Sequence, residues 1–335
     1  MDLCSPRGPL SEQLLRALHS EPGTLGVPPA PSGDPLAGDD FQLSLYLCYQ
    51  LHYRSFNDVD DRWEWSPELL AIRQSLEERF ENALRAHVTV GRRSKDRKAR
   101  DVASELQRLI DEDPWPSLSS YLETHGTPEE FREFVVHRSI YHLQEADPHT
   151  WAIPRLEGPA KAALVMIQAD EYGNGRYDRM HSTLFESVMR AFDLHTGYGA
   201  YVDHVPGTTL ATVNLMSLFG LNRRLRGALV GHLAAFEMTS VGPNGRYGNA
   251  LRGFGYGPEA TGFYDEHVTA DETHGLIASQ DLAAAFASQE PSRAADILFG
   301  AAALLFIEGR FTERLLTDWT SGRSSLTRPL IHAFA

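Results

Sequence analysis

The sequence predicts an all-α protein. From Phe41 onward almost every segment carries apolar residues at helical spacing, and alternating β-branched runs of the strand type are scarce. The 335 residues are 42% hydrophobic and 23% charged, an ordinary globular composition that can bury one large core or two smaller ones. No apolar run approaches the roughly 20 residues that span a bilayer, and the N-terminus has no signal-peptide pattern. We therefore expect a helical, cytoplasmic protein with no membrane partner.

The charge and the cysteine content exclude several classes of function. The net charge is −14, which argues against nucleic acid or an anionic membrane surface as a partner, because both are bound by clustered Lys and Arg. A small or cationic substrate fits this charge better. The only cysteines, Cys4 and Cys48, are too few for a disulfide scaffold or a Cys-rich zinc site.

Composition divides the chain into four parts. Residues 1–38 are expected to be a disordered tail, because 20–38 is dense in Pro, Gly and Ser. Residues 39–126 are expected to form an N-terminal helical extension with an aromatic-rich start, FQLSLYLCYQLHYRSF, that packs on the core and could also form a homodimer interface. The helical core then occupies 127–320, and 321–335 is a C-terminal tail.

Within the core, the clearest helix start is the sequence TPEE at Thr127, with a capping threonine, proline at the first helical position and glutamate at the third. This helix is expected to run to about residue 147. A helix over about 157–172 ends at the break Gly173-Asn174-Gly175, because Gly and Asn tolerate left-handed backbone. A further helix begins near residue 177, and the others are expected at about 207–219, 221–239, 257–275 and 293–319.

Three metal-binding groups cluster in the segment HVTADETHG. His267, Asp271 and His274 stand at i, i+4 and i+7, so on a helix they share one face. Two imidazoles and a carboxylate form a ligand set for a first-row transition metal. Their mixed N/O character suits non-haem iron better than Mg or Ca, which prefer oxygen alone.

Four more polar residues stand where a helix pattern calls for an apolar one. Glu237 is the next position in an i, i+4 row of leucines that starts at Leu225, and Glu171 ends a similar apolar row. His181 begins the inward row of its helix, and Glu145 lies near the end of the helix capped at position 127. A buried carboxylate costs several kcal/mol unless a cation or a strong donor meets it. The rows therefore predict that these side chains point toward a common interior.

Each of these residues also has a simpler interpretation. A single inward Glu is more often a paired structural residue, a single inward His is usually a hydrogen-bonded core residue, and a solvated helix face could produce the His267 cluster. Glu171 and His181 would be about 15 Å apart on a continuous helix, but the Gly-Asn-Gly break between them allows both to reach one site. A metal site is favoured because the polar residues of several helices are expected to point toward the same interior.

In chain order the candidate ligands are Glu145, Glu171, His181, Glu237, His267, Asp271 and His274. This pattern resembles that of the haem-oxygenase-like diiron oxidases, often labelled iron-containing redox enzymes. The resemblance is carried by Glu171-x9-His181, in the context EYGNGRYDRMH, and by His267-x3-Asp271-x2-His274. It implies a haem-oxygenase-like helical bundle over about 127–320 that holds two non-haem irons and no haem, with these seven residues as ligands.

The resemblance also implies a reaction. Members of the family activate O2, and the extra carboxylate, here Glu171, accompanies members that N-oxygenate amines or guanidines. We therefore expect N-oxygenation of a small amine or guanidine, in natural-product biosynthesis, with an external electron donor because the chain has no flavin or iron–sulfur motif. By analogy we expect Glu145, Glu171 and His181 at one iron and the His267 cluster at the other, with Glu237 shared.

Two alternatives stay open. The same diiron site could carry out oxidative C–C cleavage or decarboxylation of an amino or fatty acid. A protein of another class, a non-catalytic helical scaffold or a haem-binding protein, could also use this helical pattern.

Overall fold

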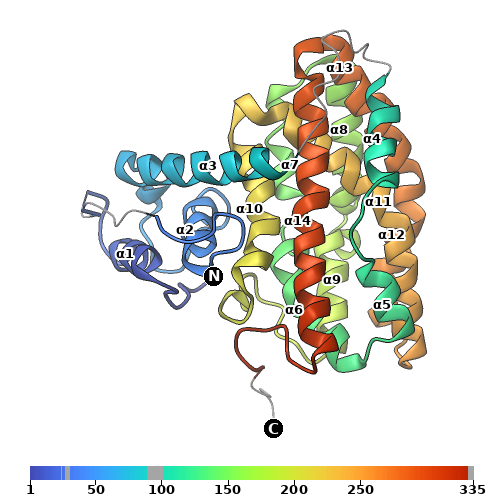
Figure 1. Cartoon of the computed structure of the whole chain (residues 1–335), viewed down its shortest axis with the longest axis horizontal. Helices are drawn as coiled ribbons and strands as arrows, with labels where there is room; N and C mark the ends of the chain where they lie inside the picture. Colours follow the sequence, from blue (N-terminus) through green and yellow to red (C-terminus); the bar gives the residue numbers. More distant parts are fainter. Residues whose placement is uncertain (24, 27–30, 89–100, 331–335) are drawn as a thin grey trace.

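The computed structural model describes residues 1–23, 25–26, 31–88 and 101–330, except for the side chains of Asp101, Asp271 and Glu272. This part of the chain contains no β-strand, so the all-α prediction is confirmed (Figure 1). The N-terminal helices are α1 (Pro9–Leu18), α2 (Asp39–Gln50), α3 (Pro67–His87), α4 (Asp101–Asp111) and α5 (Leu118–Thr124). The bundle consists of α6 (Pro128–His142), α7 (Asp147–Thr150), α8 (Gly158–Glu171), α9 (His181–Ala191), α10 (Gly207–Leu221), α11 (Arg226–Gly253), α12 (Pro258–Leu276), the π-helix η7 (Ile277–Ala284), α13 (Ala285–Gln289) and α14 (Ala294–Thr320).

The long helix α11 is the centre of the bundle, with α12 on one side and α14 on the other (Figure 1). The crossing of α11 and α14 is close because glycines lie at the contact. A Cβ atom added to Gly300 would lie 1.9 Å from the carbonyl oxygen of Ala228, and one added to Gly231 would lie 1.8 Å from that of Ile297. Side chains larger than hydrogen would therefore force these two helices apart.

The predicted start of α6 is confirmed in detail. The Thr127 hydroxyl accepts a hydrogen bond from the Glu130 amide at 3.2 Å, and the Glu130 carboxylate accepts one from the Thr127 amide at 2.9 Å. The helix ends at His142 rather than near 147, and residues 143–146 form turns. Pro148 explains the early end, because it has no amide hydrogen for the Gln144 carbonyl and its ring would clash there.

Two other helix limits differ from those expected. Helix α11 continues through Pro243 to Gly253, past the predicted end at 239, because it packs along its length on α5, α12 and α14. Helix α9 begins at His181 rather than near 177, after a short 3-10 turn over Tyr177–Arg179. Both differences reflect tertiary contacts that override local helix preference.

The expected disordered tail over 1–38 is wrong for its first half. Helix α1 buries its leucines against α2, and the Asp40 carboxylate accepts hydrogen bonds from the amides of Leu10 and Ser11 at 3.1 and 2.8 Å. The leucine row of α1 thus finds a partner within the extension, which repays the entropy of ordering. Helix α2 in turn packs on α10, so α1–α3 form a layer beside the bundle (Figure 1).

The predicted helical extension, 39–126, divides into two parts in space. Helices α2 and α3 belong to the layer with α1, whereas α4 and α5 lie on α14 and α11 on the face of the bundle seen in Figure 1. Among the described helices, none combines the length and the apolar character needed to cross a membrane.

Candidate metal centre

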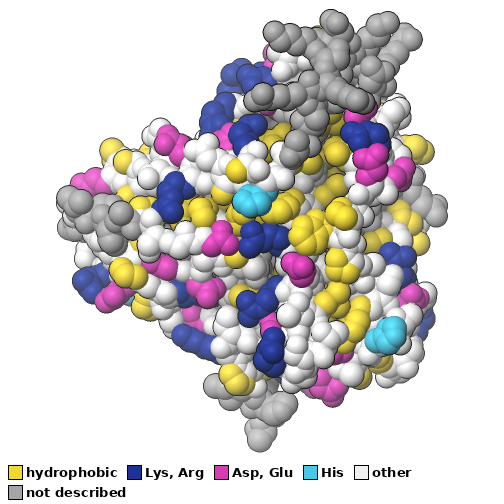
Figure 2. Space-filling model, viewed as in Figure 1, with side chains coloured by type: hydrophobic (Ala, Val, Ile, Leu, Met, Phe, Trp, Pro, Cys, Tyr) yellow, Lys and Arg dark blue, Asp and Glu magenta, His cyan; other side chains and the backbone are white. Residues whose placement is uncertain are grey.

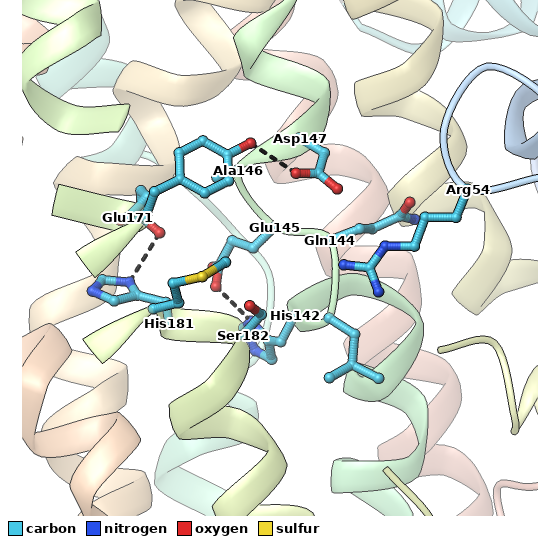
Figure 3. Close-up of a pocket in the computed structure, with 12 residues that line it drawn as sticks. Arg54, His142, Gln144, Glu145, Ala146, Asp147, Glu171, His181 and Ser182 are labelled. Atoms are coloured by element: carbon cyan, nitrogen blue, oxygen red, sulfur yellow. Dashed lines mark hydrogen bonds and ion pairs between the residues drawn. The ribbon is translucent and has the colours of Figure 1, made fainter. Parts of the chain in front are cut away.

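Glu145 lies in the turn that follows α6. Its side chain is 5% exposed, and its Oε2 atom lies 3.1 Å from Nδ1 of His142, three residues earlier (Figure 3). Burial, reinforced by the positive charge of Arg138, lowers the pKa of His142 well below its usual value. His142 is therefore neutral, and its Nδ1–H donates to the Glu145 carboxylate. This contact fixes the direction in which Glu145 points.

Glu171 and His181 meet across the Gly-Asn-Gly break. Gly173, Asn174 and Gly175 all have positive φ, at 62°, 53° and 79°, so the chain reverses directly after α8. A Cβ atom on Gly173 would lie 2.6 Å from the backbone of Arg179, so this close approach requires glycine. His181 consequently starts α9 with its Nδ1 atom 2.9 Å from Oε2 of Glu171 (Figure 3). The expectation that the break would bring these two residues together is confirmed.

Helix α12 supplies two histidines. Nδ1 of His267 lies 2.8 Å from the carbonyl oxygen of Phe263, one turn earlier, and therefore donates to it. The other ring nitrogen, Nε2, faces Glu145, with Oε2 at 3.9 Å, and the ring lies against His181 with the centroids 4.3 Å apart. Backbone anchoring of one nitrogen fixes the tautomer and leaves the lone pair of Nε2 directed into the site.

His274 is held in a similar way by a carboxylate. Its Nε2 atom lies 3.0 Å from Oδ2 of Asp170, and its Nδ1 atom lies 3.6 Å from Oε2 of Glu237 on α11. A histidine with a carboxylate on its outer nitrogen is the usual arrangement behind a metal ligand. Glu237 and His274 are both buried, at 3% and 4% exposure.

The donor atoms form two overlapping groups. Ligand atoms of the first group lie within 4.8 Å of one another, as do those of the second, and Glu171 belongs to both. The first group is Glu145, Glu171, His181 and His267, and the second is Glu171, Glu237 and His274. This grouping differs from the expected one, in which His267 accompanied His274 and Glu237 was shared. Seven residues separate the two histidines, about 10 Å along a helix, so they reach different groups.

Asp271 lies on α12 between these histidines, but its side chain is outside the described residues. Its place among the ligands stays a prediction.

The residues present fit a transition-metal site. Three buried carboxylates and three buried imidazoles gathered this closely are costly to desolvate unless cations lie among them. Nε2 of His267 is buried and makes no hydrogen bond to any residue of the described ranges. The N/O character of the donors suits iron better than Mg or Ca, which prefer oxygen alone.

Sequence reasoning missed two residues of this site. One is His142, whose spacing of three residues from Glu145 is a signal for contact on one helical turn. The other is Asp170, which adjoins Glu171 in sequence and has a side chain that is 40% exposed, as is typical of a surface residue. Only the approach of α12 to the end of α8 reveals its role.

A cavity of about 230 Å³ adjoins the first donor group. Glu145, His142 and His267 form its inner end, and its walls combine aromatic side chains such as Phe134 with polar ones such as Ser240 and Asn244. The cavity therefore leads to the first donor group and has room for a small organic molecule.

Comparison with known proteins agrees with this geometry. A 140-residue stretch is 29% identical to a nitrosourea synthase from Streptomyces achromogenes subsp. streptozoticus. That stretch covers 42% of this chain and 30% of the relative, so the matched part is less than a third of that protein. The family model of iron-containing redox enzymes matches residues 132–309, which is more than half of the chain and includes every candidate ligand. With its all-α, haem-oxygenase-like bundle, the chain belongs to the iron-containing redox enzyme family.

Proposed function

We propose that the chain is a non-haem diiron oxygenase that N-oxygenates a small amine or guanidine. The observation that carries the proposal is the pair of overlapping donor groups joined by Glu171. A shared carboxylate allows two cations to sit side by side, and the three histidines supply neutral donors that leave room for another ligand. The name of the relative, nitrosourea synthase, supports N-oxygenation, because a nitrosourea contains oxidised nitrogen.

The donor groups suggest which residues would hold each iron. Glu145, Glu171, His181 and His267 would hold one iron, and Glu171, Glu237 and His274, with Asp271, the other. When bound, the irons supply the site at which O2 is reduced with two electrons from an external donor. For a primary amine the net change is R–NH2 + O2 + 2e⁻ + 2H⁺ → R–NHOH + H2O.

The surrounding side chains prepare the site for this reaction. Asp170 holds the proton on Nε2 of His274, and the Phe263 carbonyl oxygen holds the proton on Nδ1 of His267, so both rings present lone pairs inward. The substrate nitrogen would approach Glu145 at the inner end of the cavity, beside the aromatic side chains of Phe134 and Phe236.

The test is incubation of the Fe(II)-loaded chain with a panel of amines and guanidines, a reductant and ¹⁸O2, followed by mass spectrometry. The proposal expects ¹⁸O on nitrogen in at least one product. Loss of carbon as CO2, formaldehyde or an alkene without N-oxidation would indicate C–C cleavage instead. A Soret band after addition of haem, with no iron bound in its absence, would indicate a haem-binding protein.

A further inference from the structure

The outer wall of the cavity comes from a part of the chain that precedes the family match. Asp113, Ser117, Leu118 and Ser119 line the cavity; the first two lie in the segment between α4 and α5, and the other two are the first residues of α5. The segment lies on the face shown in Figure 2, where hydrophobic side chains gather along α14 and beside it. The cavity therefore runs from the metal donors to this segment.

Trp115 packs the segment on α14. The indole of Trp115 lies directly on Gly309 of α14, so that a Cβ atom there would come within 2.1 Å of the ring. The same indole packs edge-on to Phe306, with the centroids 6.1 Å apart. Trp115 thus sets the position of Asp113, two residues earlier.

The charges on the cavity wall are unbalanced. Arg138 makes two hydrogen bonds to Glu308, at 3.1 and 2.6 Å, so these two residues neutralise each other. Glu145 faces the metal donors at the inner end. Asp113 remains: it is partly buried, it accepts a hydrogen bond from the Trp115 amide, and it makes no ion pair with a residue that the structure describes. Burial raises the pKa of Asp113, as expected of a carboxylate without a nearby cation.

The cavity wall also carries a buried hydroxyl group. Tyr264 is 1% exposed, and its hydroxyl makes no hydrogen bond to any described residue. Tyr264, Tyr247 and Arg138 line the same cavity. A buried hydroxyl without a partner costs about 1–3 kcal/mol, which a ligand with a polar group would recover.

We infer that Asp113 binds a cationic group of the substrate at the outer end of the cavity, while a different nitrogen of the same molecule reaches the metal centre. The inference rests on the proposed function. Two nitrogens are required because a protonated amine has no lone pair to be oxygenated, so the ammonium held by Asp113 cannot be the reacting group. The apolar part of the lining, which includes Phe134, Phe236 and Leu304, fits a hydrocarbon linker. The substrate class is therefore a bifunctional molecule: an amine or guanidine joined by an apolar spacer to an ammonium or guanidinium.

The experiment compares two probes that differ only in the second charge. 1,6-Diaminohexane and hexylamine are titrated, by calorimetry, into the full chain loaded with Fe(II) under anaerobic conditions. The diamine is expected to bind about tenfold more tightly or better, the usual gain from a charge-assisted hydrogen bond. Asp113→Asn should remove this difference, and Asp113→Glu should keep part of it.

Asp111→Asn is the matched control. Asp111 is exposed at the end of α4, and its carboxylate accepts a hydrogen bond from Gln107 at 2.9 Å. The control changes the net charge equally without touching the cavity wall, so the difference between the probes should persist. The inference would be overturned if Asp113→Asn kept the preference for the diamine over hexylamine. It would also be overturned if Asp111→Asn lost that preference to the same extent as Asp113→Asn.

Failure of the proposed function would look different. If the chain binds no iron, the titrations are repeated on the metal-free protein. A preference for the diamine that depends on Asp113 would then support the cation site without the metal centre. If iron binds normally but the ratio of the affinities for the diamine and hexylamine does not depend on Asp113, the result supports the metal centre and contradicts the substrate assignment.

Discussion

Nε2 of His274 lies 3.0 Å from the Asp170 carboxylate, and this contact decides which ring nitrogen faces the interior. With a proton held at Nε2, the lone pair of Nδ1 is directed toward Glu237, 3.6 Å away. Asp170 and Glu171 are neighbours at the end of α8, so one helix end supplies both an orienting carboxylate and a candidate shared ligand.

Asp170→Asn should weaken metal binding by about 10–100-fold, the usual cost of losing an outer partner of a ligating histidine. The amide keeps the size of the side chain but does not hold the imidazole in one tautomer. Titration with Fe(II) under anaerobic conditions measures the effect. Asp281→Asn, at an exposed position on η7, is the control and should bind as tightly as the unchanged chain. Equal affinities for both variants would mean that Asp170 is only a surface residue.

Glu171→Gln and Glu237→Gln should have unequal effects on iron content. Glu171 belongs to both donor groups, whereas Glu237 belongs to one. We expect Glu237→Gln to retain about one iron per chain and Glu171→Gln to retain less than about one, because a neutral amide is a poor iron ligand. Circular dichroism should find both variants as helical as the parent. The same iron content in the two variants would contradict the shared role of Glu171.

The sequence patterns predicted local features well. The capping box at Thr127 and the chain reversal at Gly173 depend on adjacent residues, and both are present. The inward placement of Glu237 followed from a row of leucines on one helix face.

The grouping of His267 with Glu145 and His181 could not be predicted from such local patterns, because it depends on which helix lies opposite each turn of α12. The cavity wall at Asp113 depends on Trp115 meeting Gly309, residues almost 200 positions apart. Helix α1 was missed because its partner, α2, lies beyond the Pro- and Gly-rich stretch.

Gly309→Ala should displace the segment between α4 and α5. The added methyl group would overlap the Trp115 indole, a kind of overpacking that costs about 1–3 kcal/mol. Urea unfolding measures the free energy of unfolding, and tryptophan fluorescence reports the movement of the indole. Gly262→Ala is the control: no atom lies within 4 Å of the added Cβ, so a neutral or slightly stabilising effect is expected in helix α12. Equal stability of the two variants would show that Trp115 is not held on Gly309.

His137 should make the metal-free chain sensitive to acid. Its ring contacts the hydroxyls of Thr209 and Ser325 at 2.7 and 3.0 Å, and burial lowers its pKa to about 3. Below pH 6.5 the unfolded chain takes up a proton that the folded chain does not, so this contribution to stability is lost as pH falls, by about 1.4 kcal/mol per unit down to the folded pKa.

The check compares urea unfolding of the parent with His137→Gln between pH 7 and pH 5. The variant loses both hydrogen bonds and is less stable at pH 7, but it lacks the titrating ring, so the gap between the two should narrow on acidification. His125→Gln, at an exposed position, should leave the pH dependence of the parent unchanged. A gap that stays constant over this range would mean that His137 is not buried as a neutral ring.

The most direct test of the metal centre is anomalous X-ray scattering at the iron edge from crystals of the chain loaded with Fe(II) under anaerobic conditions. Two peaks are predicted, one beside Glu145, His181 and His267 and the other beside Glu237 and His274, with the Glu171 carboxylate touching both. No peak among these residues, or a single peak that leaves Glu237 and His274 without metal, would contradict a diiron centre.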